Sequence, residues 1–425
     1  MIENEEINIE HIANKCVGCI TKPCQMGCPL NNDTTEFIKL IKQQNYKEAF
    51  EILSKTTVLT CVCGRICPHE KQCQGSCAMK KKYGAVEIGK MESFIGDEAI
   101  NNNWDIKKIN NAYHKEKIAI VGAGPSGLTC AAFLSKNGYQ VTIYEKHEYL
   151  GGLLYHGIPE FRLDKTTLKK TIDKILKLGI KVNTNCELGT NIYLKDLEKE
   201  YDAIFLGFGA NVSRKMNIPG ENLKGVYGGN ELLENKLHPN YKNKKVAVIG
   251  GGNVAMDTAR TIKKLGADEV TIIYRRSEKE MPAEVKEIEE AKEENIKFLF
   301  QTNPIKIIGK ENVEKIECVR MKLEQKEHET RLSPVEIPNS NFTLDMDYIV
   351  MAVGSKPEDT ILSSLNLEIN EKGYLKINKD NQTSNHKIFA GGDLAQSRGT
   401  VAWASRSGRN AAYSIMTFLE NKSKY

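Results

Sequence analysis

The sequence predicts an α/β protein in which a helical, cysteine-rich segment precedes two Rossmann-like dinucleotide-binding units. Nine of the twelve cysteines lie between Cys16 and Cys77. Two glycine-rich turns, beginning at Gly122 and at Gly250, each follow an apolar run and precede a helical pattern. The order strand, glycine-rich turn, helix, strand is typical of a parallel α/β sheet. Two copies of this unit in one chain indicate two nucleotide domains.

Length and charge agree with this organisation and exclude several classes of protein. A chain of 425 residues corresponds to about three domains. Lysine and arginine (60) exceed aspartate and glutamate (55) by only five, and the excess is too diffuse for a nucleic-acid partner. No apolar run approaches the ~18 residues that span a membrane. The acidic start after Met1 does not resemble a secretory leader, so we expect a cytoplasmic protein.

The N-terminal zone is expected to consist of short helices that carry the cysteines. Residues 33–41 have a helical pattern that Asp33 would cap. The first cysteine set is Cys16-x2-Cys19-x4-Cys24-x3-Cys28-Pro29. The second is Cys63-x3-Cys67-Pro68 followed by Cys73-x3-Cys77, with Cys61 outside it.

These cysteines predict metal binding, because cytosolic chains rarely use cysteines in disulfides. Zinc sites also present closely spaced cysteine pairs. However, nine cysteines are more than one zinc needs, and two of them, Cys28 and Cys67, precede proline. The Cys-Pro cysteine of two-cluster ferredoxins ligates the other cluster. We therefore favour [4Fe–4S] clusters and keep zinc as the alternative.

The first dinucleotide fingerprint is Gly122-Ala123-Gly124-Pro125-Ser126-Gly127, between a strand at 118–121 and a helix at 128–134. Its glycines would form the tight turn, admit a pyrophosphate and allow close helix packing, while the helix N-terminus supplies N–H groups. Glu145 ends the next strand, at 141–144. It has the spacing of a carboxylate that accepts hydrogen bonds from ribose hydroxyls.

Two further glycine motifs favour FAD at this first site. Gly151-Gly152-Leu153 follows Glu145, and Gly391-Gly392-Asp393 follows an expected strand at 387–390. Asp393 could hold ribityl hydroxyls. The helix from about Thr400 to Leu419 could direct its positive end at flavin N1, where reduction builds negative charge.

The second fingerprint is Gly250-Gly251-Gly252-Asn253-Val254-Ala255, with alanine at the close-packing position. The following strand, 270–274, ends in Arg275-Arg276 and has no acid at its tip. A carboxylate would repel a 2′-phosphate, whereas guanidinium groups bind one as a fork. We therefore predict NADP(H), with a merely charged loop as the alternative. The charged run 278–297 is expected to be a solvated helix face.

In their order along the chain, these motifs resemble the small subunit of NADPH-dependent glutamate synthase. The resemblance covers nearly the whole sequence and includes Tyr274-Arg-Arg-x4-Met-Pro-Ala283 and Gly391-Gly-Asp393. The same architecture occurs in the large subunit of the transhydrogenase that couples NADPH to ferredoxin and NADH. It also occurs in sulfide dehydrogenases and in the N-terminal half of dihydropyrimidine dehydrogenase.

The resemblance implies an adrenodoxin-reductase-like fold in which an NADPH domain interrupts an FAD domain. The expected domains are a helical double [4Fe–4S] domain (1–112), a first FAD part (113–237), an NADPH domain (238–352) and a second FAD part (353–425). By position, one cluster would be ligated by Cys16, Cys19, Cys24 and Cys77. The other would be ligated by Cys28, Cys67, Cys73 and Glu92, with Cys61 and Cys63 spare. The FAD site would further include Lys146, Gly152, Leu153, Arg162, Gly209, Gly392, Thr400 and Val401.

The function implied by the resemblance is electron transfer from NADPH through FAD and two [4Fe–4S] clusters to a partner protein. The partner would be a glutamate synthase large subunit or a ferredoxin-type acceptor, within a hetero- or homo-oligomer. Because flavin performs the chemistry, no catalytic side chain is expected, and His156 is more readily a loop histidine near the flavin than a general acid. A dithiol reductase would need a cysteine pair beside the flavin, but Cys130, Cys186 and Cys318 are isolated in the sequence. A zinc-containing nucleotide-binding regulator without turnover is the alternative from another class.

Overall fold

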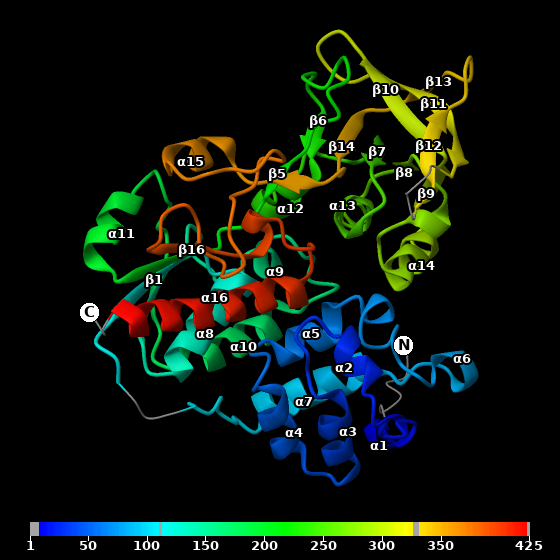
Figure 1. Cartoon of the computed structure of the whole chain (residues 1–425). Coiled ribbons are helices and arrows are strands. Elements are labelled where there is room, and N and C mark those ends of the chain that lie inside the picture. Colours follow the sequence, from blue (N-terminus) through cyan, green and yellow to red (C-terminus); the bar gives the residue numbers. More distant parts are fainter. Residues whose placement is uncertain (1–7, 110–112, 326–330, 423–425) are drawn as a thin grey trace. The chain divides into compact units, whose positions relative to one another are not determined.

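The computed structural model describes residues 8–109, 113–325 and 331–422 (Figure 1). The chain divides into two compact units. Unit 1 comprises residues 1–155, 160–209 and 359–425, and unit 2 comprises residues 156–159 and 210–358. Within the described residues, none of the helices has the length and apolar character needed to cross a membrane.

The N-terminal part of unit 1 is helical, as the sequence predicts. The Asp33 carboxylate accepts a hydrogen bond from the Glu36 amide (3.3 Å) and so caps α3. Two helices, α5 and α7, cross at close range: a Cβ on Gly96 would lie 2.5 Å from Cys61 Cα. The elements are α1 (Ile9–Asn14), α2 (Pro23–Gly27), α3 (Thr34–Lys42), α4 (Tyr46–Leu53), α5 (Thr60–Ile66), η1 (His69–Lys71), α6 (Lys80–Tyr83) and α7 (Ile88–Asn101).

The rest of unit 1 is built on a five-stranded parallel sheet in the order β16-β4-β1-β2-β3. Its strands are β1 (Lys117–Val121), β2 (Gln140–Tyr144), β3 (Lys181–Asn183), β4 (Ala203–Leu206) and β16 (Ile388–Ala390). The helices are α8 (Pro125–Lys136), α9 (Leu153–His156), α10 (Lys165–Leu176), α11 (Leu194–Glu200), α15 (Asp359–Ser364), η3 (Gly392–Ala395) and α16 (Val401–Lys422). Strand β16 is far from the other strands in sequence but pairs with β4 at the edge of this sheet. The helix that follows it, α16, packs along α8 (Figure 1).

Unit 2 repeats the architecture with a second parallel sheet, in the order β6-β14-β7-β8-β9. Its strands are β6 (Val226–Gly228), β7 (Lys245–Ile249), β8 (Glu269–Tyr274), β9 (Lys297–Phe300) and β14 (Tyr348–Met351). Its helices are α12 (Gly229–Asn235), α13 (Asn253–Lys264), η2 (Glu278–Glu280) and α14 (Val285–Glu293). An antiparallel sheet follows, formed by β10 (Thr302–Ile308), β11 (Lys315–Glu324), β12 (Ser333–Glu336) and β13 (Phe342–Asp345), and β5 (Val212–Ser213) pairs with β15 (Ser355–Lys356).

Two segments that the sequence places in the FAD parts, 210–237 and 353–358, lie in unit 2. Residues 210–237 contribute β5, β6 and α12 to that unit. The physical reason is that β6 pairs with β14, so its backbone hydrogen bonds are made in the second sheet. The expected boundary after residue 112 lies outside the described residues.

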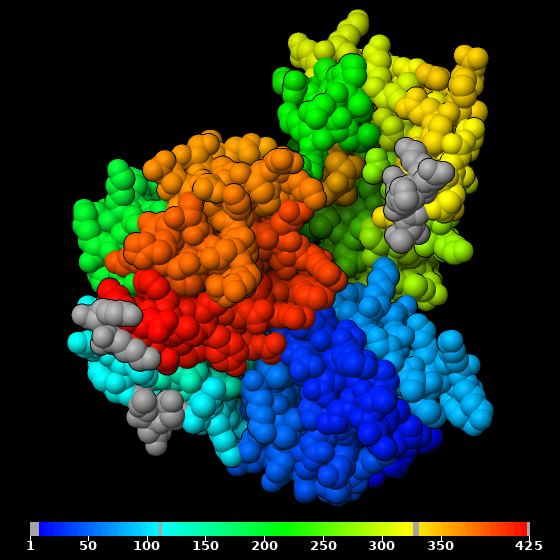
Figure 2. Space-filling model, viewed as in Figure 1, coloured from blue at the N-terminus to red at the C-terminus, as the bar shows by residue number. Residues whose placement is uncertain are grey.

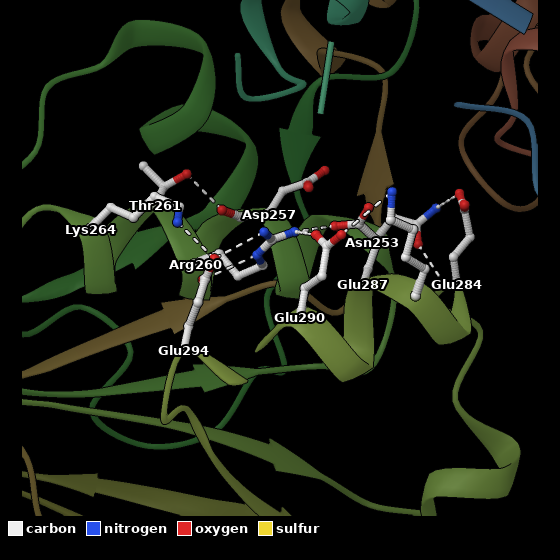
Figure 3. Close-up of polar contacts among 10 residues, drawn as sticks. Asn253, Asp257, Arg260, Thr261, Lys264, Glu284, Glu287, Glu290 and Glu294 are labelled. Carbon is white, nitrogen blue, oxygen red and sulfur yellow. Dashed lines mark hydrogen bonds and ion pairs between the residues drawn. The ribbon is translucent and has the colours of Figure 1, made fainter. Parts of the chain in front are cut away.

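A buried ion-pair network joins α13 to α14 in unit 2 (Figure 3). The Arg260 side chain is only 5% exposed, and its Nη1 lies 2.5 Å from Glu287 and 2.7 Å from Glu290. Its Nη2 lies 2.9 Å from Glu294. The charged run 278–297 is therefore not solely a solvated face, because Glu287 is buried against this arginine.

We expect Arg260→Ala to destabilise unit 2 by about 3–5 kcal/mol, because it leaves the buried Glu287 charge without this partner. Lys286→Ala is the matched control: Lys286 pairs with Glu290 at 3.5 Å, but its side chain is 78% exposed. A surface pair of this kind contributes about 0–1 kcal/mol. Urea unfolding of the full chain measures both values. Equal, small losses for the two variants would contradict the importance of the network.

Candidate dinucleotide sites and cysteine centre

The first fingerprint forms the turn between β1 and α8. Gly122 has φ +98°, and a Cβ on Gly127 would lie 1.9 Å from the Gly122 carbonyl oxygen. Both positions therefore require glycine. Glu145, at the end of β2, accepts hydrogen bonds from the Ala123 amide (2.7 Å) and the His147 amide (3.0 Å). Glu145 thus holds the fingerprint turn, and its carboxylate oxygens retain lone pairs for ribose hydroxyls.

The motif Gly151-Gly152-Leu153 lies against this turn. The Gly151 amide donates to the Ala123 carbonyl (3.0 Å), and a Cβ on Gly152 would lie 2.9 Å from Gly124 Cα. The two glycine motifs therefore form one side-chain-free backbone surface, as close approach by a pyrophosphate requires. Of the other expected FAD residues on this side, Lys146 is exposed, Leu153 begins α9, Arg162 is half-buried, and Gly209 has φ +82°. His156 ends α9 and is half-buried.

The segment 391–400, which precedes α16, also contacts the first fingerprint. A Cβ on Gly392 would lie 2.7 Å from Ser126 Oγ, so these expected FAD residues are brought together. The Oδ1 atom of Asp393 is buried and has no hydrogen-bond partner in the described structure. Burial raises the pKa of Asp393 to about 6, and a backbone hydrogen bond from Gly399 opposes this only partly. Val401 begins α16, and Thr400 immediately precedes it.

The unsatisfied oxygen of Asp393 tests whether FAD fits this site. Buried polar atoms normally have partners, and a ribityl hydroxyl is a donor that would satisfy this oxygen. The side-chain-free surface at Gly124 and Gly152 also suits a pyrophosphate. The residues of this site therefore fit the expected cofactor.

The second fingerprint forms the corresponding turn between β7 and α13. Gly250 has φ +142°, and a Cβ there would lie 2.2 Å from the Ala352 carbonyl oxygen. Gly252 precedes α13, and Ala255 is fully buried at the close-packing position. The Asn253 side chain accepts the Glu284 amide (3.1 Å), which fixes the start of the helix (Figure 3). Val254 is half-buried beside it.

Three arginines gather where β8 ends. Arg276 Nε donates to the Leu332 carbonyl (2.9 Å), and Arg331 Nη2 donates to the Tyr274 hydroxyl (2.6 Å) and to the Glu280 carbonyl. Partial burial lowers the pKa of Arg275, and the neighbouring Arg276 and Arg331 charges lower it further. Three mutually repelling guanidinium groups suit a phosphate. The sequence pattern did not reveal Arg331, because it lies 55 positions after Arg276 and only the fold brings the two together.

All twelve cysteines are free thiols. Members of both sequence sets surround Cys24 on one side and Cys28 on the other, and these groups are called the first and second cysteine neighbourhoods. Burial raises the pKa of Cys24, with smaller contributions from the nearby Cys16 and Cys77 thiols. Burial raises the pKa of Cys28 to about 11, and here the neighbours are Glu92 and Cys63. One neighbourhood therefore contains three of the four ligands expected for the first cluster. Cys19, the fourth, is half-buried.

The second neighbourhood contains all four residues expected for the other cluster. A hydrogen bond with Cys63, together with burial, raises the pKa of Cys67. Burial raises the pKa of Cys73, and the nearby Glu92, Cys28 and Cys24 raise it further, so Cys73 lies where the two neighbourhoods meet. Cys63, expected to be spare, thus lies within this group. Cys61 lies apart, because its Sγ accepts from Arg65 Nη1 (2.9 Å) and donates to Asp97 (3.2 Å).

Glu92 is the acidic member of this second neighbourhood. Burial raises its pKa to about 8. Its Oε1 accepts a hydrogen bond from Asn32 Nδ2 (3.2 Å), and Asn32 Oδ1 accepts one from Thr56 Oγ1 (2.6 Å). Among the described residues, no three or more His, Cys, Asp or Glu side chains are grouped so that they could hold a metal ion. The fit therefore depends on donor chemistry, and thiolates are the ligands of iron–sulfur clusters.

Comparison with known proteins shows relatives along almost the entire chain. Residues 116–408 match the pyridine nucleotide-disulphide oxidoreductase family, and residues 2–104 match dihydropyrimidine dehydrogenase domain II, a 4Fe-4S cluster domain. The glutamate synthase [NADPH] small chain of Halomonas elongata is 35% identical over 96% of this chain and 90% of that protein. The putative oxidoreductase AegA of Escherichia coli is 36% identical over 97% of this chain and 66% of its own length.

A solved structure shares the fold. FprA of Mycobacterium tuberculosis in complex with NADPH superimposes with a TM-score of 0.67 and 20% identity, over 73% of this chain and 86% of that chain. The predicted α/β class is confirmed, and so is the resemblance to glutamate synthase small subunits that the motifs indicated. The chain therefore belongs to the pyridine nucleotide-disulphide oxidoreductase family and is a homologue of the glutamate synthase small chains.

Proposed function

We propose that this chain oxidises NADPH and delivers the electrons singly, through FAD and two [4Fe–4S] clusters, to a redox partner protein. One observation carries the proposal: the first fingerprint and both cysteine neighbourhoods belong to unit 1. When bound, FAD supplies the conversion of a hydride into single electrons, and the clusters supply one-electron transfer. The protein contributes position, charge and exclusion of water.

Different residues of this chain would bind different parts of the two dinucleotides. The Gly124–Gly152 surface would hold the FAD pyrophosphate, Glu145 its ribose and Asp393 its ribityl chain. The N-terminus of α16 would favour negative charge on the flavin ring. The second fingerprint would hold the NADPH pyrophosphate. This division keeps the four domains expected from the sequence, with residues 210–237 and 353–358 moved to the NADPH domain.

The alternatives have weaker support. A dithiol reductase would need two adjacent cysteines, but Cys130 is buried in α8 and Cys318 is buried in β11 of the other unit. A zinc-binding regulator would not need two cysteine neighbourhoods. An absorption spectrum separates the functions, because flavin bands above a broad brown shoulder indicate iron–sulfur and zinc absorbs no visible light.

The partner would be a glutamate synthase large subunit, since relatives such as that of Halomonas elongata are named as small chains. A ferredoxin-type acceptor, as in the transhydrogenase, is the second candidate. The chain that co-purifies under anaerobic conditions identifies the acceptor.

We expect a strong preference for NADPH over NADH, because arginines gather at the end of β8. Replacing Arg275 and Arg276 by alanine removes charge-assisted hydrogen bonds of about 1.5–3 kcal/mol each. The KM for NADPH should therefore rise by roughly 10-fold or more for each arginine lost. The KM for NADH should hardly change. Steady-state rates with ferricyanide as acceptor measure both constants.

The matched control is Arg320→Ala in the same unit, since that guanidinium lies 4.3 Å over the Phe342 ring. It should leave both KM values unchanged, whereas Arg331→Ala should raise the value for NADPH alone. A wild-type enzyme that prefers NADH would refute the assignment of this site.

A further inference from the structure

Three consecutive residues of α16 join the flavin site to the cysteine-bearing helices. Ser407 Oγ accepts a hydrogen bond from the Gly392 amide (3.1 Å), beside Asp393. A Cβ on Gly408 would lie 2.0 Å from the Ser126 carbonyl oxygen, so this turn of α16 touches the first fingerprint. Arg409 Nη1 donates to the Leu30 carbonyl (2.9 Å) and the Thr56 carbonyl (2.7 Å). Figure 2 shows the blue N-terminal residues directly beside this red helix.

The two carbonyls that Arg409 contacts are linked to the second cysteine neighbourhood. Leu30 follows Cys28-Pro29 in the chain. The Thr56 hydroxyl donates to Asn32 (2.6 Å), and the Asn32 amide donates to Glu92 (3.2 Å). A continuous path of covalent and hydrogen bonds therefore leads from α16 to two of the residues expected to ligate one cluster.

The Arg409 guanidinium also brings positive charge close to this neighbourhood. The side chain is half-buried. Burial lowers the pKa of Arg409. Tyr413 opposes that shift, Arg406 adds to it, and Cys28 makes the smallest opposing contribution. An arginine nevertheless remains protonated in proteins. In a partly desolvated place its charge is screened less than a surface charge.

We propose that Arg409 is a positioning residue that fixes the Cys28–Asn32 segment to the flavin helix and raises the reduction potential of the cluster ligated by Cys28, Cys67, Cys73 and Glu92. The inference rests on the proposed function. With both groups bound, the step that Arg409 would assist is the transfer of one electron from reduced flavin to this cluster, which would pass from the 2+ to the 1+ state. A fixed positive charge favours the more negative reduced cluster.

The test is an anaerobic redox titration of the full-length protein, followed by electron paramagnetic resonance of the reduced clusters. Arg409→Gln removes the charge and keeps hydrogen-bond donors. It should lower the midpoint potential of one cluster signal by about 59 mV, which corresponds to a tenfold shift for one electron. Arg409→Lys keeps the charge and should restore most of the potential. The other cluster signal, the FAD content and the iron content should not change.

Arg406→Gln is the control, because Arg406 is exposed on the same helix and stacks on Trp403 at 5.1 Å. It should leave both potentials in place. The shifted signal should be the one that Cys67→Ser abolishes. If Arg409→Gln loses iron, Arg409→Lys still tests the inference. The lysine charge occupies a different position from the guanidinium, so the midpoint potential of the same cluster signal should fall, but by less than about 59 mV.

Two outcomes would overturn the inference: unchanged potentials in both Arg409 variants, or a shift in the signal that Cys16→Ser abolishes. Both leave the proposed function intact. A wild-type protein without iron–sulfur signals would refute the proposed function and this inference together.

Discussion

Replacing Cys16 by serine should remove one [4Fe–4S] cluster and leave the other intact, and replacing Cys67 should do the converse. The reason is that Cys16 lies near Cys24, whereas Cys67 lies near Cys63, Glu92 and Cys73. The wild-type chain should contain about eight irons, as two four-iron clusters require. Each variant should contain about four. Iron analysis and electron paramagnetic resonance of anaerobically prepared protein measure the result.

Glu92 and Cys63 provide the sharper part of this test, because both lie in the second neighbourhood. We expect Glu92→Ala to change or abolish the second cluster signal and Cys63→Ser to preserve both clusters. Cys61→Ser is the matched control, since Cys61 is engaged by Arg65 and Asp97. Loss of a cluster in Cys63→Ser, with both retained in Glu92→Ala, would show that the fourth ligand is a cysteine.

The glycine-rich turns were predictable from the sequence because their requirements are local. A positive φ at Gly122 and the close approach of Gly127 to the preceding turn depend on residues within one unit of the fold. The same holds for the Asp33 cap, which acts over three residues. For Glu145, the sequence pattern predicts the position after the second strand. It does not predict that the carboxylate accepts a hydrogen bond from the Ala123 amide, which only the structure shows.

Contacts between distant segments could not be derived from spacing. Arg331 reaches Tyr274 only because the antiparallel strands of unit 2 return to the end of β8. Arg409 reaches Leu30 across 379 positions of sequence. The buried Glu287 lay in a charged run that is otherwise typical of a solvated helix, and its partner Arg260 is on another helix. In each case the partner of a charged side chain lies on an element that is distant in sequence, so a local sequence pattern cannot predict the contact.

The isolated chain should act as a diaphorase and form no glutamate. With NADPH as donor it should reduce artificial acceptors such as ferricyanide or viologen dyes. The physical reason is that the residues for both dinucleotides and the two cysteine neighbourhoods are present, while nothing in the sequence resembles a glutaminase domain or an FMN-binding synthase barrel. Dye reduction and glutamate formation from glutamine and 2-oxoglutarate are measured on the same homogeneous preparation.

Adding the partner subunit should restore product formation, and Cys16→Ser separates the two activities. If the cluster of Cys28, Cys67, Cys73 and Glu92 accepts electrons from the flavin, then the cluster that contains Cys16 is the one nearer the partner. Cys16→Ser should therefore preserve flavin reduction by NADPH, followed by stopped-flow absorption, and reduce delivery to the partner. Substantial glutamate formation by the chain alone would refute this division of labour, because the carbon and nitrogen chemistry would then need residues within these two units.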